Sequence, residues 1–249
     1  MMNGFKVLFK LNMKKRIKDS FLIGYGVTFP LMLIIILGYM ATNYYSKDGI
    51  VTSYYYYSMV TIPFCTFLSS ITLIYVAKEE SLHKCGERFI IVPISKTSIV
   101  LSKILPATIS ISVYNLILLL ICNFIFKVDF RGRFLEVYIL IISLGFMSSA
   151  LGTLIGLCSK DFMSIKNIVS TPILIMAVLG GSFFPIGSLG TVFERISYIS
   201  PLTWINKGIF MMMNDNTVTV YIISLFITII LGLFFTISSI KFFKKEAFI

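Results

Sequence analysis

The side chains most able to do chemistry gather in one connection between two apolar blocks. Glu79 and Glu80 are followed closely by His83, the single histidine of the chain, and by Lys84. Acidic side chains beside basic ones suggest proton transfer or metal-assisted hydrolysis. Either reaction needs several polar side chains close together in space, and a single histidine cannot form a metal site or a proton relay by itself. We therefore interpret His83 as a solvated loop residue and exclude an intramembrane protease.

No stretch of the sequence could hold the phosphates of a nucleotide. The pattern GxxxxGK[ST], whose backbone N–H groups and lysine bind phosphate, does not occur. The cysteines form no CxxC pair, so neither a disulfide framework nor a zinc site is indicated; they are Cys65, Cys85, Cys122 and Cys158. We expect no catalytic residue, metal or cofactor in this chain, so that any ATP and magnesium would be bound by a partner.

The composition indicates a membrane as the main solvent. Hydrophobic residues make up 57% of the 249 residues and charged residues only 13%, far from the balance of a soluble domain. The net charge of +11 could suggest nucleic acid, but the Lys and Arg residues lie between the apolar blocks, where cytoplasmic loops concentrate positive charge. We therefore exclude nucleic-acid binding.

The apolar residues form six blocks of about 20 residues, the length that a helix needs to cross a bilayer. We predict an all-α integral membrane protein of one domain, 1–249, in which six transmembrane helices cover about 20–42, 54–77, 103–126, 135–158, 167–184 and 218–240. The fifth block is the weakest, because Pro172 lies near its start and Gly180 and Gly181 near its end. A broken or half-length helix is plausible there.

The distribution of basic residues predicts how the chain is oriented in a plasma membrane. Sixteen of the 22 Lys and Arg residues precede the first span, follow the last, or lie in the connections on that same side. The excess of positive charge on cytoplasmic loops places both termini in the cytoplasm.

The segment 1–19 before the first span is predicted to be an amphipathic interfacial helix. Apolar residues recur every fourth position, and lysines recur one position later. The apolar set is Phe5, Phe9, Met13, Ile17 and Phe21, and the basic set is Lys6, Lys10, Lys14 and Lys18.

Two external segments also carry patterns. Tyr44, Tyr45 and the run 54–57 flank the first external loop and are interpreted as an aromatic belt at the headgroup layer. The last external loop, about 185–217, is more apolar than a connection exposed to water would be. We expect it to dip into the membrane as a re-entrant hairpin before the last span.

Polar and small residues within the spans suggest how the helices meet. Asn115 lies near the middle of the third block and Asn123 nearer its outer end; a hydrogen bond between helices is favoured over contact with a transported substrate, and both remain open. Ser148, Gly152 and Gly156 repeat at four-residue spacing in the fourth block. This face predicts close helix packing, within or between subunits.

Two motifs follow one another along the chain. In the connection 77–104, clustered glutamates precede Gly86, Pro93 and Ser95, and Lys103 enters the next helix. The segment 180–205 contains Gly-Gly, Phe-Phe-Pro and a later Pro-Leu-Thr. In this order the two motifs resemble the ABC-2 type permeases, drug-export branch. The second motif is similar to the family's re-entrant hairpin, although Gly190 stands where a proline is usual.

The resemblance implies a half-transporter that pairs with a second permease subunit and two cytoplasmic ABC ATPase subunits. It implies that the glutamate-bearing connection forms the helix gripped by the ATPase, through Glu79, Glu80, Gly86, Glu87 and Pro93. A second set could shape an outer gate, namely Phe183, Phe184 and Pro185.

The leading interpretation is ATP-driven export of an amphipathic or hydrophobic compound such as a drug, an antimicrobial peptide or a lipid. An exporter of a lipid-linked glycan or teichoic-acid precursor is an alternative within the same family. A membrane sensor or assembly protein without transport is an alternative of another class, and it would need no ATPase partner.

Overall fold

The computed structural model describes residues 2–43, 52–82, 94–159, 162–184 and 190–243, and all regular elements in these ranges are helical. Five helical stretches within them are long and apolar enough to cross a membrane, which agrees with an all-α integral membrane protein. They are Ser20–Met40, Ser53–Lys78, Lys96–Phe124, Phe134–Cys158 and Val218–Phe242.

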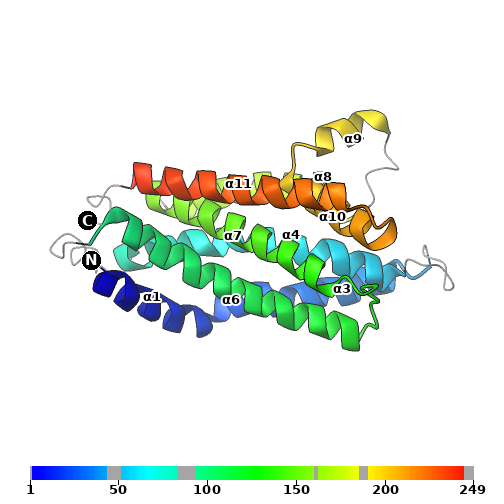
Figure 1. Cartoon of the computed structure of the whole chain (residues 1–249), viewed down its shortest axis with the longest axis horizontal. Coiled ribbons are helices and arrows are strands. Elements are labelled where there is room, and N and C mark those ends of the chain that lie inside the picture. Colours follow the sequence, from blue (N-terminus) through cyan, green and yellow to red (C-terminus); the bar gives the residue numbers. More distant parts are fainter. Residues whose placement is uncertain (1, 44–51, 83–93, 160–161, 185–189, 244–249) are drawn as a thin grey trace.

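The long helices lie side by side in a bundle (Figure 1). At its centre α7 (Phe134–Cys158) packs against α4 (Ser53–Leu82), α6 (Lys96–Phe124) and α11 (Val218–Phe242). The start of α1 and the end of α11 lie at the same end of this bundle.

Glycines in α7 bring it close to α4. A Cβ added at Gly152 would lie 2.5 Å from the backbone oxygen of Ser70, and one at Gly156 would lie 2.6 Å from Ala77 Cβ. Ser148, one turn before Gly152, is fully buried. The prediction that this face makes a close helix contact is confirmed, and the contact lies within the chain.

The first long helix is interrupted by a wider turn. It consists of α2 (Ser20–Ile23), the π-helical η1 (Gly24–Thr28) and α3 (Phe29–Met40). Asp19 caps its start, and its Oδ1 accepts hydrogen bonds from the N–H groups of Phe21 and Leu22 at 3.1 and 3.2 Å. The N–H of Phe29 bonds to the carbonyl of Gly24, five residues back. Pro30, which follows, has no N–H to continue the ordinary pattern.

The N-terminal helix α1 (Met2–Ile17) packs along α6. Asn12 donates a buried hydrogen bond of 2.8 Å to the carbonyl of Ser102. Arg16 is 3% exposed, and its Nη1 lies 2.6 Å from Asp19 Oδ2. The helix is therefore fastened to the bundle by polar contacts as well as by apolar ones.

The predicted apolar face of this helix holds only over its first three turns. The side chains of Phe5, Phe9 and Met13 are half-buried, but Ile17 is 57% and Phe21 71% exposed. A spacing of four residues turns by 400° rather than 360°, so the row drifts about 40° at each step. By Ile17 the predicted apolar row has rotated off the protein.

The segment between α7 and α11 contains three shorter helices, α8 (Phe162–Leu179), α9 (Thr191–Ser197) and α10 (Pro201–Asn214). The stretch Asn167–Leu179 of α8 is apolar, and it contains Pro172 inside the helix. Helix α9 stands away from the bundle, whereas α10 lies beside α11 (Figure 1).

Candidate coupling and translocation sites

The predicted coupling connection joins the ends of α4 and α6. Helix α4 continues to Leu82 and α6 begins at Lys96, so both helices extend beyond the predicted blocks. Glu79 and Glu80 fall in the last turn of α4, and their side chains lie outside what the structure describes. Gly86, Glu87 and Pro93 also lie outside the described residues.

Both helix ends are anchored at this end of the bundle. A buried apolar cluster collects residues from α4, α6, α7 and the chain just after α11: Ala77, Ile99, Val100, Ile104, Ala150, Leu157 and Phe243. Ser95 caps α6, and its Oγ accepts a hydrogen bond of 3.2 Å from the N–H of Ser98. Because interiors are closely packed, a displacement of either helix end is passed to its neighbours.

At the other end, α4 holds the chain that follows α8. The Tyr56 hydroxyl donates to the carbonyl of Gly181 at 2.9 Å, and the Tyr57 hydroxyl donates to the carbonyl of Phe183 at 3.2 Å. From α10, Asn206 Nδ2 donates to the carbonyl of Gly180 at 2.7 Å. Three helices that are not consecutive in the sequence, α4, α8 and α10, therefore meet at one short segment, 180–183.

The prediction that the tyrosine run forms an aromatic belt is wrong for Tyr55, Tyr56 and Tyr57, which are buried. The Tyr55 hydroxyl lies 3.3 Å from Asn214 Oδ1, so all three hydroxyl groups have partners in the protein. Tyr44 and Tyr45 lie outside the described residues. The sequence pattern did not predict that these rings face inward. The phenol of a tyrosine is compatible with the headgroup layer and equally with a buried site that offers a carbonyl acceptor.

The predicted outer-gate residues differ in their surroundings. Phe183 is half-buried, and its ring lies 5.5 Å from the ring of Phe64 on α4. Phe184 is 42% exposed, and Pro185 lies outside the described residues. Phe183 also lines a cavity of about 530 Å³ together with Phe64 and residues of the first long helix and α8.

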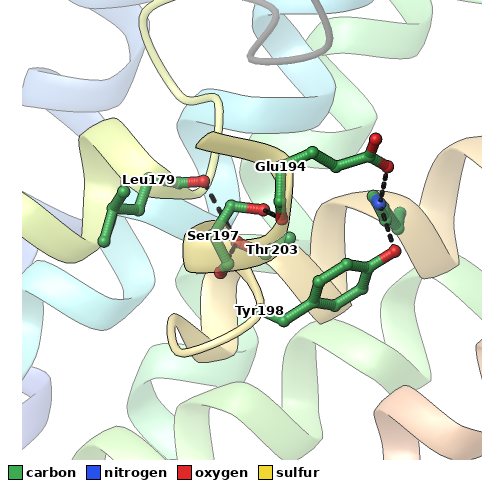
Figure 2. A network of polar contacts seen from close by, with 6 residues as sticks. Leu179, Glu194, Ser197, Tyr198 and Thr203 are labelled. Carbon is green, nitrogen blue, oxygen red and sulfur yellow. Dashed lines mark hydrogen bonds and ion pairs between the residues drawn. The ribbon is translucent and has the colours of Figure 1, made fainter. Parts of the chain in front are cut away.

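Helices α9 and α10 are joined by a polar network that sequence reasoning did not find (Figure 2). Lys207 Nζ lies 3.0 Å from Glu194 Oε1 and 2.7 Å from the Tyr198 hydroxyl. Thr203 Oγ1 lies 3.1 Å from the carbonyl of Leu179 and 2.5 Å from that of Ser197. The network fastens α9 to α10 and the start of α10 to the end of α8.

The two asparagines predicted within the third span occupy different positions on α6. Asn115 is 3% exposed, and its Oδ1 accepts a hydrogen bond of 3.1 Å from Thr66 Oγ1 on α4. Asn123 is exposed near the end of the helix. Asn115 thus forms a hydrogen bond between two helices. A role of Asn115 or Asn123 in a translocation pathway stays a prediction.

A bundle of long apolar helices, with polar groups buried between them, defines a multi-pass membrane protein. The family model for the ABC-2 type transporter matches residues 3–214, and the chain belongs to this family. It is therefore a membrane permease component of an ABC transporter, a class that works with an ATP-binding subunit. A search of curated proteins found no match.

Proposed function

We propose that this chain is the permease subunit of an ABC exporter, moving an amphipathic or hydrophobic substrate out of the cell. The supporting observation is the position of α4, whose last turn includes Glu79 and Glu80 and which holds the segment after α8 through Tyr56 and Tyr57. One helix thus joins the connection proposed to meet the motor to the proposed outer gate.

The proposed topology has six crossings and two cytoplasmic termini. The five long helices supply five crossings, and α8 followed by α10 supplies the sixth, with α9 in the re-entrant excursion between them. The start of α1 and the end of α11 lie at one end of the bundle, which agrees with an even number of crossings (Figure 1). The excess of Lys and Arg assigns that end to the cytoplasm.

The proposed complex contains a second permease, identical or different, and cytoplasmic ATPase subunits that bind ATP and magnesium. In this assignment the chain itself catalyses no reaction and binds no cofactor. Apolar side chains exposed on α3, α8 and α9 provide a surface for membrane lipid or for the second permease; they include Met32, Ile36, Ile168, Ile175, Val192 and Phe193.

The coupling role is tested by charge reversal of Glu79, Glu80 and Glu87 to lysine. Like charges that meet at an interface cost up to several kcal/mol, whereas an exposed loop tolerates such changes within about half a kcal/mol. We expect the triple variant to lose copurification of the ATPase, or to keep it and lose transport. The measurements are ATPase copurification and transport at equal permease amounts.

The matched control reverses Asp129 and Asp215, which are exposed at the opposite end of the bundle. This variant should keep both copurification and transport. Unchanged copurification and transport in the glutamate variant would remove these residues from the mechanism. Failure of the wild-type chain to copurify with any ATPase would instead favour a sensor or assembly protein, and stimulation of the ATPase by a lipid-linked glycan would favour glycan export.

A further inference from the structure

A basic cavity lies where α1 turns into the first long helix. Its volume is about 650 Å³, and its wall includes Lys14, Lys15, Arg16 and Lys18 beside Asp19. Tyr75, from the last third of α4, and Leu11 add a partly apolar side. The cavity is therefore formed between two elements far apart in the sequence rather than by α1 alone.

Two lysines of this cavity are exposed to solvent and could contact a bound anion. Asp19, the acid among the described lining residues, forms its ion pair with Arg16 at 2.6 Å. Lys14 and Lys18 are exposed, and neither makes an ion pair with any residue that the structure describes. The cavity is suited to a group that carries negative charge on several oxygens, such as a phosphate.

An apolar groove continues from the basic cavity. Ser20 and Phe21 line both spaces. The groove, of about 530 Å³, runs between the first long helix and side chains that include Leu68 on α4 and Leu174 on α8. A phosphate alone would fill only the basic part, whereas a molecule with a charged head and a hydrocarbon tail would fill both.

We propose that the chain binds one anionic glycerophospholipid, with its phosphate headgroup beside Lys14 and Lys18 and an acyl chain in the groove beside Gly24 and Leu68. The lipid comes from the leaflet in which α1 lies. In this position it bridges α1, α4 and α8, so it is a resident ligand and not transported cargo. The proposal rests on the two cavities and does not depend on export or on an ATPase.

The test uses the full chain purified in phosphatidylcholine mixed micelles and titrated with phosphatidylglycerol, with bound lipid counted by native mass spectrometry. We expect one tightly bound phosphatidylglycerol for each chain. The variant K14Q/K18Q should lose affinity about 30-fold, since each lysine near an anionic headgroup contributes about fivefold.

The matched control is K6Q/K10Q, which removes the same charge from exposed positions of the same helix that do not line the cavity. Its affinity should fall far less than that of K14Q/K18Q, because neither side chain lines the cavity and salt partly screens the remaining attraction. Equal losses in both double variants, no loss in either, or equally tight binding of phosphatidylcholine would each overturn the proposal.

Two further experiments distinguish a site for a lipid from a site for free phosphate. Gly24 lines the groove, and a Cβ there would meet no atom within 4 Å, so Gly24→Leu should fill the groove and weaken phosphatidylglycerol binding about tenfold. Millimolar glycerol 1-phosphate should not displace the lipid. Displacement by glycerol 1-phosphate, or full affinity in Gly24→Leu, would show a phosphate site without an acyl-chain groove and would overturn the lipid assignment.

Discussion

At the residue scale, the tyrosines of α4 show how one side-chain type serves different environments. Successive residues of a helix are 100° apart, so a run of four tyrosines cannot keep to one face. Tyr55, Tyr56 and Tyr57 are buried and have hydrogen-bond partners within the protein. The burial of a tyrosine in a membrane bundle thus depends on acceptors that the sequence alone does not place.

Replacing Tyr56 by phenylalanine should destabilise the bundle by about 0.5–1.5 kcal/mol, because the carbonyl of Gly181 loses its buried donor. The measurement is the unfolding midpoint in detergent. Tyr39→Phe is the control, since Tyr39 is 76% exposed. Equal losses in the two variants would contradict the importance of the Tyr56 bond.

The Glu194–Lys207 ion pair should contribute little to stability. Both side chains are partly exposed, and exposed pairs contribute about 0.2–1 kcal/mol. A double-mutant cycle with Glu194→Gln and Lys207→Gln should give a coupling energy in this range that falls as salt is raised. A coupling well above that range, or one insensitive to salt, would show that the pair is shielded in the assembled transporter.

At the element scale, the contact between α4 and α7 depends on the absence of a side chain at Gly152. Gly152→Ala should destabilise the bundle by about 1–3 kcal/mol, because the new Cβ would meet a backbone oxygen that cannot rotate away. Gly24→Ala has open space around its Cβ and a helical φ of −58°, so it should be neutral or stabilising. Thermal unfolding in the same detergent compares them.

The long helices were predictable, because each buries its own backbone polar groups and needs an apolar surface of bilayer length. The ends of these helices were less predictable. Helix α4 continues past its apolar block to Leu82, and α6 begins before its block, at Lys96. A helix can continue into polar sequence beyond the apolar block. The network of Glu194 and Lys207 was not predictable, because a short helix and a turn bring the two residues together and no spacing rule connects them.

At the scale of the whole molecule, the membrane topology can be tested by chemical labelling of cysteines. Cys158 is an exposed free cysteine at the end of α7, and both it and Cys85 are predicted to face the cytoplasm. A membrane-impermeant maleimide should label neither on intact cells and should label Cys158 in inside-out vesicles. The variant Asp129→Cys, at the opposite end, should react on intact cells. Labelling of Cys85 on intact cells would overturn the topology.

The isolated chain should neither bind nor hydrolyse ATP, because its sequence lacks a phosphate-binding loop. Equilibrium dialysis with labelled ATP and a phosphate-release assay on the purified chain provide the measurement. Addition of the partner ATPase should restore both signals. Saturable ATP binding by the chain alone would contradict the assignment of the motor to another protein.

In the proposed coupling, the continuous helix α4 acts as a lever arm between the two ends of the molecule. Tyr56 and Glu79 are 23 positions apart on it, which corresponds to about 35 Å, and a tilt of about 5° at one end sweeps the other end through about 3 Å. That sweep is as long as the bond from Tyr56 to Gly181. A small rotation at the base therefore either pulls the chain after α8 along with the helix or detaches it, and the strength of two tyrosine hydrogen bonds decides between these outcomes.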